Sequence, residues 1–223
     1  MTAVALPIVT VDELLRAQGA DPARLGARHA ALAAIAEEAL EAGAAAVTPG
    51  VTWSWREVRG VHPGRVLLDG AGPLRHAALA EGLAGASRVA AAALTLGPGL
   101  ERLVVSHVMG RPSLALALDA YGSTVLMRLG TEARQAIAAE AAAHGLAMGP
   151  SLFPGMPGWP VVPGQAELLG LLDAPPEGLT LTELGMLVPG KSLTFLVGAG
   201  SDLAPGGAPC DGCDASPRCP HRA

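Results

Sequence analysis

The residues with the clearest chemical potential are the cysteines, and all of them lie in one short C-terminal stretch. The 223-residue chain contains three, Cys210, Cys213 and Cys219. Cysteines that serve as small core hydrophobes would be scattered along the chain, so their clustering favours a metal site. An odd number of thiols also fits a disulfide framework badly. The sequence therefore predicts that these thiolates ligate one inorganic centre.

The spacing of these cysteines leaves the identity of the metal open. Three thiolates can hold an iron–sulfur cluster in which another group binds one iron, or a zinc ion completed by His221 or Asp214. The Cys219-Pro220 pair resembles the end of ferredoxin-type ligand runs and favours the cluster. A Gly/Pro-rich tail with free thiols is the third alternative.

A second chemical motif spans residues 185–192, where the letters match the phosphate-binding pattern GxxxxGK[ST]. Such a loop works because backbone N–H groups and a following helix N-terminus surround the phosphates. Residues 193–197 are β-branched and aromatic and predict a strand instead. We therefore reject triphosphate binding and expect Lys191 to be a surface or cleft cation.

Other polar groups give weaker signals for a site. Asp119 and Glu183 are the acidic residues most embedded in apolar sequence, which makes them candidates for polar contacts in a cleft. The six histidines form no pair at metal-binding spacing. Apart from His221, we expect them to be surface residues or core residues with satisfied hydrogen bonds.

Apolar periodicity and turn residues predict the elements that position these groups. The small apolar run 87–96 is typical of a central strand covered on both faces. The stretch 149–164 is rich in Pro and Gly and predicts an ordered loop over a cleft, and Gly122 marks a possible bend or close contact in a long helix. The predicted helices are 22–46 (capped by Asp21), 73–83, 99–109, 112–144 and 165–172, and the further strands are 51–58, 65–68, 179–183 and 192–197.

Composition limits the possible partners. The chain is 50% hydrophobic and 16% charged, which predicts a folded domain with a core of Leu, Val and Ala, because aromatic residues make up only 3%. The net charge of −5 and a single lysine argue against nucleic acid and anionic membranes as partners.

No apolar run reaches the roughly 18 residues that span a bilayer, and Met1–Val11 does not resemble a secretory signal. We expect a cytoplasmic protein with a globular domain at 1–203 and a metal-binding tail at 204–223.

Several segments, read in order, resemble the activation domain of cobalamin-dependent methionine synthase. Their order and spacing match the family motifs PGY…WP, LLD, LTES and P-x-K-S, and two further segments and the C-terminus are similar to free-standing family members. The matching stretches are 153–160, 171–173, 181–183 and 189–192, with 95–99, 118–123 and 219–222 for the free-standing form.

The resemblance implies an α+β fold in which helices flank an antiparallel sheet. It also implies an accessory subunit that docks on a separate cobalamin-binding methyltransferase and supports reductive reactivation of its corrinoid, with an electron donor protein as second partner. An iron–sulfur tail would then relay the electron. The alternative is a non-catalytic capping module whose tail holds structural zinc.

The same resemblance implies a cleft for S-adenosylmethionine. Two positions depart from the family motif, because Ser151 stands where the family has Arg and Met156 where it has Tyr. Neither replaces a bidentate guanidinium or an oriented phenol, so we expect weak or absent affinity unless Arg128, Arg134 or Lys191 substitutes. The residues expected at this cofactor cleft are Pro154, Gly155, Met156, Pro157, Glu183 and Lys191.

Overall fold

A five-stranded antiparallel sheet organises the fold, and a computed structural model describes residues 5–201 and Leu203. The strand order is β2-β1-β3-β7-β4, and a separate two-stranded hairpin pairs β5 with β6. The strands are β1 (Gly50–His62), β2 (Arg65–Leu68), β3 (Arg88–Thr95), β4 (Ala147–Leu152), β5 (Thr180–Leu181), β6 (Leu187–Val188) and β7 (Ser192–Gly200). The helices are α1 (Val11–Ala17), α2 (His29–Ala46), α3 (Ala77–Gly82), α4 (Gly99–His107), α5 (Pro112–Ala143) and α6 (Val161–Leu169).

The central strand is β3, as its run of small apolar residues predicts. It pairs with β1 on one side and β7 on the other, and its residues from Val89 to Thr95 are buried. Ala90, Ala92 and Leu94 belong to the core on one face, whereas Val89, Ala91 and Ala93 belong to the core on the other. A strand buried on both faces reads as continuous apolar sequence, because neither set of alternating side chains meets water.

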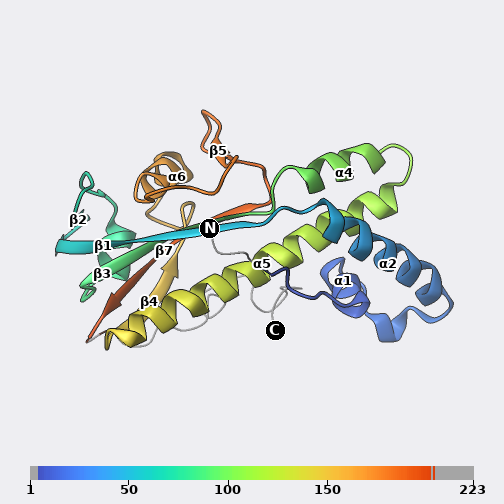
Figure 1. The fold of residues 1–223 in the computed structure, drawn as a ribbon, viewed down its shortest axis with the longest axis horizontal. Coiled ribbons are helices and arrows are strands. Elements are labelled where there is room, and N and C mark those ends of the chain that lie inside the picture. The colour runs from blue at the N-terminus through green and yellow to red at the C-terminus, as the bar shows by residue number, and fades with distance from the viewer. Residues whose placement is uncertain (1–4, 202, 204–223) are drawn as a thin grey trace.

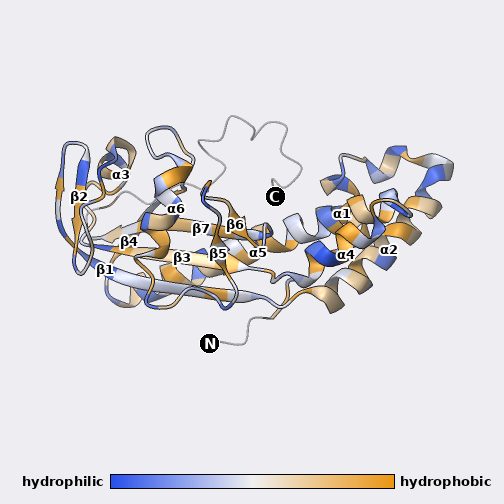
Figure 2. Ribbon diagram, turned by 90° about the horizontal axis from the view of Figure 1, so that it is seen from above, coloured by the Kyte–Doolittle hydropathy of each residue, from blue (hydrophilic) through white to orange (hydrophobic). Residues whose placement is uncertain are grey.

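Helices cover both faces of the sheet, which confirms the predicted α+β class. The long helix α5 crosses one face, and α3, α6 and the β5–β6 hairpin lie on the other (Figure 1). Helices α1, α2 and α4 gather around the N-terminal half of α5, beyond the end of the sheet. The view from above shows these helices at one end of the molecule and the sheet with α3 and α6 at the other (Figure 2).

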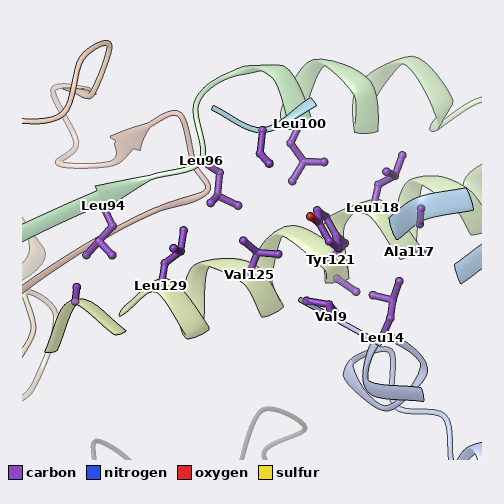
Figure 3. Close-up of a cluster of buried hydrophobic side chains, with 14 of the residues drawn as sticks. Val9, Leu14, Leu94, Leu96, Leu100, Ala117, Leu118, Tyr121, Val125 and Leu129 are labelled. Carbon is purple, nitrogen blue, oxygen red and sulfur yellow. The ribbon is translucent and has the colours of Figure 1, made fainter. Parts of the chain in front are cut away.

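The larger core lies between α5 and its neighbours. Leu100, Leu118, Val125 and Leu129 are fully or almost fully buried there. Figure 3 shows Leu118 and Val125 on either side of Tyr121 and Leu129 further along α5. Burial raises the pKa of the Tyr121 phenol, because the charged phenolate loses its hydration there. Leu, Val and Ala fill this core with few rings, as the composition predicts.

Glycines in two helices allow this close packing. A Cβ on Gly43 of α2 would lie 2.5 Å from Cδ1 of Tyr121, and one on Gly122 of α5 would lie 2.5 Å from Cδ2 of Leu100. Both distances are too short for non-bonded carbon atoms. Gly122 therefore serves close packing against a side chain, and α5 continues through it as one 32-residue helix.

The N-terminal helices differ from the prediction. Asp21 does accept a hydrogen bond from the N–H of Ala23, but it caps only the 3₁₀ turn Pro22–Arg24. Gly26 has a φ of 53°, which ends that turn, so a second 3₁₀ turn at Gly26–Arg28 precedes α2. Helix α1 was not predicted, although Thr10 and Glu13 form a capping box at its start.

The stretch predicted as a loop at 149–164 is partly regular, so this prediction was wrong at both ends. Residues 147–152 form β4, and α6 begins at Val161. Pro150 is tolerated because β4 is an edge strand and its register shifts between Met148 and Ser151, so the missing N–H costs no ladder bond. Only residues 153–160 remain a turn segment.

Smaller differences concern boundaries. Strand β1 extends four residues beyond the predicted end, and the strand predicted at 179–183 is reduced to the two residues of β5. Helix α3 is shorter than predicted, and α6 starts and ends earlier. The predicted boundary between a domain at 1–203 and a tail at 204–223 remains a prediction, because 204–223 lies outside the described residues. No helix in the described part of the chain has the length and apolar character of a membrane span.

Candidate functional site

The turn segment that carries Pro154, Gly155, Met156 and Pro157 is closed by its own backbone hydrogen bonds. The N–H of Gly155 donates to the carbonyl of Trp159 at 2.7 Å, and the N–H of Met156 donates to the carbonyl of Phe153 at 3.1 Å. Gly155 has a φ of 100°, a conformation that residues with a Cβ rarely adopt. The segment is therefore a built turn rather than a linker.

Trp159 anchors this turn to the molecule. Its side chain is 1% exposed, and its indole N–H donates to Oε2 of Glu167 on α6 at 3.3 Å. The same carboxylate oxygen lies 2.8 Å from Nε2 of His76, at the N-cap of α3, and the His76 side chain is 11% exposed. This polar cluster was not identified from the sequence, although His76 does fit the expectation of a satisfied histidine.

Glu183 lies in the exposed turn between β5 and β6. The hairpin is held by the N–H of Thr182, which donates to the carbonyl of Met186 at 2.9 Å. A Cβ on Gly185 would lie 2.6 Å from Cγ2 of Val162, and one on Gly155 would lie 3.0 Å from Cγ2 of Val161. The start of α6 therefore brings the hairpin of Glu183 and the turn of Met156 together.

Lys191 occupies a different setting, between α4 and α5. Its Nζ lies 2.8 Å from Oδ1 of Asp119 and donates to Oγ of Ser123 at 2.8 Å. Its stem packs over Gly122, where an added Cβ would lie 3.3 Å from its Cε. The Lys191 side chain is 17% exposed, so the prediction of a cleft cation holds, and Asp119 makes the polar contact expected of it.

A cavity of about 250 Å³ adjoins this ion pair. Helix α4 contributes the apolar part of its wall together with Glu101, and Asp119 and Lys191 contribute the other charged groups. Oε1 of Glu101 accepts the N–H of Gly190 at 2.6 Å, which fixes the start of β7 against α4. The residues lining the cavity are Leu100, Glu101, Val104, Val105, Asp119 and Lys191.

The segment that matches the phosphate-loop letters does not have the structure of a phosphate loop. Ser192 begins strand β7, which runs to Gly200, and its hydroxyl lies 2.8 Å from the hydroxyl of Thr95. No helix N-terminus follows the motif, so the donors that would surround a triphosphate are missing. The structure thus confirms the strand that the sequence predicts at 192–197.

Cys210, Cys213 and Cys219 lie outside the described residues, as do His221 and Asp214. Within residues 5–201 and 203, no group of three His, Cys, Asp or Glu side chains is placed to hold a metal ion. The thiolate centre remains a prediction.

Arg134 and Ser151, which the sequence analysis names for the cofactor cleft, both lie where α5 packs against β4. Nη2 of Arg134 donates to the carbonyl of Gly149 at 3.1 Å. Nη1 of Arg134 and Oγ of Ser151 are both buried and have no hydrogen-bond partner among the described atoms. Only the packing of α5 against β4 brings these groups to one seam, so spacing along the chain could not show that they are neighbours.

Comparison with known proteins identifies the class of fold. No protein-family model matches the chain, and no curated protein matches it in sequence. Among solved structures, the chain is similar to the MetH reactivation domain bound to AdoHcy, with a TM-score of 0.53 and 13% identity, over 88% of this chain and 78% of that one. The chain therefore has the fold of that reactivation domain, as the resemblance of its motifs implies.

Proposed function

We propose that this chain is an accessory protein that docks on a cobalamin-binding methyltransferase of the methionine synthase type and supports reductive reactivation of its corrinoid. The observation that carries the proposal is the fold likeness to the MetH reactivation domain over 88% of the chain. A fold alone does not define a function, so the ordered motifs and the built turn at 153–160 add independent support.

The chemistry would couple an unfavourable step to a favourable one. One electron from a separate donor protein would convert the partner's cob(II)alamin to cob(I)alamin. The methyl group of S-adenosylmethionine would then transfer to cobalt and leave S-adenosylhomocysteine. The reduction is uphill and the methyl transfer is downhill, so holding both reactants in one complex draws the reduction forward. The role of this chain would be to bind S-adenosylmethionine, to orient its methyl group toward the corrinoid and to enclose the two reactants.

An exposed apolar surface supports docking on a partner. Around the start of α6 and the hairpin, Leu184 is 78% exposed and Met186 is 61% exposed, next to Val161, Val162 and Val188. We call these five residues the hairpin patch. Contiguous exposed apolar side chains of this kind mark interaction sites more often than ordinary surface, and the turn of Pro154–Pro157 adjoins the patch through Val161.

For the cofactor cleft we retain the residues that the sequence predicted. Pro154, Gly155, Met156 and Pro157 would border the nucleoside, and Glu183 would stand at its rim. Lys191 would supply a cation from its separate setting between α4 and α5. The ligand class follows the AdoHcy that the neighbouring structure holds.

The tail would hold the inorganic centre through Cys210, Cys213 and Cys219. Three thiolates suit iron–sulfur or zinc ligation. A cluster supplies one-electron chemistry, whereas zinc supplies only structure, so the metal distinguishes a reactivating subunit from the alternative capping module.

The experiment is anaerobic purification of the full chain, followed by metal analysis and a corrinoid re-methylation assay with a cobalamin-binding methyltransferase. We expect a brown protein with about four irons per chain and re-methylation that requires this chain. The variant C210S/C213S/C219S should lose the metal and the re-methylation together. A colourless protein with one zinc would favour the capping module, and re-methylation that is independent of this chain would exclude the reactivating role.

A further inference from the structure

The cavity of about 250 Å³ beside α4 lies apart from the turn of Met156 and from the β5–β6 hairpin. Its lining residues come from α4, from α5 and from Lys191, directly before β7, and none of them belongs to residues 153–160 or 180–188. Figure 1 shows α4 above the N-terminal half of α5, whereas α6 lies over the sheet. A ligand in this cavity would therefore bind at a second site, separate from the cofactor cleft.

Two opposite charges line this cavity without contacting each other. Glu101 and Lys191 both border it, but among the described residues Glu101 takes part in no ion pair. Its carboxylate accepts one hydrogen bond there, from the N–H of Gly190 to Oε1. A ligand that carries both signs of charge can bridge such a pair, because each of its charged ends then meets an opposite charge in a partly enclosed site.

The ammonium of Lys191 is held in place and keeps one donor for a ligand. Oδ1 of Asp119 lies 2.8 Å from Nζ, and Nζ donates to Oγ of Ser123 at 2.8 Å. An ammonium has three N–H donors, and the third has no acceptor among the residues that the structure describes. The stem packs over Gly122, and the side chain is only 17% exposed. Lys191 can therefore donate to a carboxylate oxygen without leaving Asp119.

The rest of the wall is apolar and belongs to α4. Leu100 is fully buried, Val104 is half-buried, and Val105 is 71% exposed. Pockets for drug-sized ligands measure roughly 300–1,000 Å³, so this cavity suits a smaller molecule with an apolar part. Two carboxylates and one ammonium give the wall a net charge of −1, which disfavours phosphates and other multiply charged anions.

We propose that this cavity binds a free α-amino acid with an apolar side chain. At neutral pH such a molecule carries an ammonium and a carboxylate on the same carbon atom. The ammonium pairs with Glu101, the carboxylate accepts a hydrogen bond from Lys191, and the side chain packs on the apolar residues of α4. A simple amine would leave the third donor of Lys191 unused, and a fatty acid would leave Glu101 unpaired. The site rests on the cavity and its charges and does not depend on the proposed function.

The test compares three small molecules that share one butyl group, by ligand-observed NMR on the full chain. L-Norleucine has both charged groups, pentylamine lacks the carboxylate, and hexanoate lacks the ammonium. We expect norleucine to bind in the millimolar range, since so small a ligand makes few contacts. Pentylamine and hexanoate should each bind roughly 10-fold more weakly or worse, because each lacks one charge-assisted hydrogen bond.

Two variants should remove the two contacts separately. Glu101→Gln keeps an oxygen for the N–H of Gly190 but removes the charge, and it should weaken norleucine roughly 10-fold with no loss for hexanoate. Lys191→Met keeps the stem over Gly122 but removes the ammonium, and it should weaken norleucine by a similar factor with no loss for pentylamine. Glu132→Gln, at an exposed position of α5, is the matched control and should change neither. If circular dichroism shows that Lys191→Met folds poorly, Glu101→Gln and its control decide.

Opposite responses of the two variants would not follow from a merely structural role, and they would support the site. If pentylamine binds as tightly as norleucine, or if norleucine does not bind at all, the amino-acid site is wrong. If S-adenosylhomocysteine displaces norleucine, Lys191 serves the cofactor cleft and there is no separate site. None of these results depends on corrinoid re-methylation, so failure here leaves the proposed function standing, and failure of that function leaves this site standing.

Discussion

The two faces of the central sheet are covered in different ways. On one face, the single 32-residue helix α5 buries a regular stripe that includes Leu118, Val125 and Leu129. On the other face, the cover consists of α3 with six residues, α6 with nine, and turns rich in Pro and Gly. Isolated helices this short are unstable in water, so long-range contacts must hold them in place.

This difference explains where the candidate site residues lie. Met156, Glu183 and the hairpin patch are all on the face of short elements, where turns can present backbone and side chains without disturbing a helix. The hydrogen bonds from Trp159 and His76 to Glu167 tie three such elements together. The α5 face contributes rigid support and, at its edges, the two basic groups Lys191 and Arg134. A rigid layer that supports a variable one is a common arrangement for binding sites.

The largest effect should come from the anchor of the short elements. Trp159→Ala removes a side chain that is 1% exposed and should lower the free energy of unfolding by about 3–5 kcal/mol. Trp53→Ala is the matched control on the other face, where the indole is only half-buried, and should cost clearly less. Urea unfolding of the three proteins measures both values. Equal losses of unfolding free energy would show that the short elements on the side of α6 do not depend on Trp159 as their anchor.

A second substitution examines the regular face. Leu118 is fully buried and Leu116 is 60% exposed on the same helix. Leu118→Ala should cost about 2–4 kcal/mol through lost burial and the cavity that remains. Leu116→Ala should change stability by less than about 0.5 kcal/mol, because alanine suits an exposed helix position. Thermal unfolding followed by circular dichroism distinguishes them, and a large loss for Leu116→Ala would mean that another surface covers this side of α5.

The smallest effect concerns acid stability at the N-terminal end of the α5 layer. The N–H of Thr10 donates to Glu13 and, with the Thr10 hydroxyl and Arg128, lowers the pKa of this carboxyl below 4.5. A lowered folded-state pKa means that the stabilisation is complete above about pH 4.5 and is lost as the pH falls through the lower value.

Glu13→Gln should therefore lower stability at pH 7 by about 0.5–1 kcal/mol, since the capping box is weakened. At acid pH the variant and the wild-type chain should converge. Glu37→Gln on the exposed side of α2 is the control. Urea midpoints measured from pH 7 to pH 3 follow the difference, and a constant difference across this range would contradict a role for ionised Glu13.

Local sequence patterns predicted the elements whose own residues show a clear apolar run or a helical repeat. The apolar run 87–96 predicted β3 because burial on both faces leaves no polar alternation. The pattern of α5 predicted a helix because it repeats over many turns. The capping box of Thr10 and Glu13 is a local signal for the start of α1, although the prediction did not include this helix.

Other elements could not be read from their own residues. Pro150 argues against a strand, and only the edge position of β4 makes it acceptable. His76 and Glu167 are 91 residues apart, and Lys191 and Ser123 are 68 residues apart. Spacing along the chain says nothing about such pairs, because their distance in space is set by how whole elements pack.

The sequence by itself determined the α+β class, the central strand, the long helix and the likeness to the activation domain of methionine synthase, because these depend on periodicity and ordered motifs. Tertiary structure alone decided that Lys191 meets Asp119, that Trp159 anchors the turn of Met156, and that Arg134 faces β4 without a counter-charge. The physical reason is that an ion pair or an unpartnered donor is a property of neighbours in space, and helices and strands acquire those neighbours only when their apolar faces pack together.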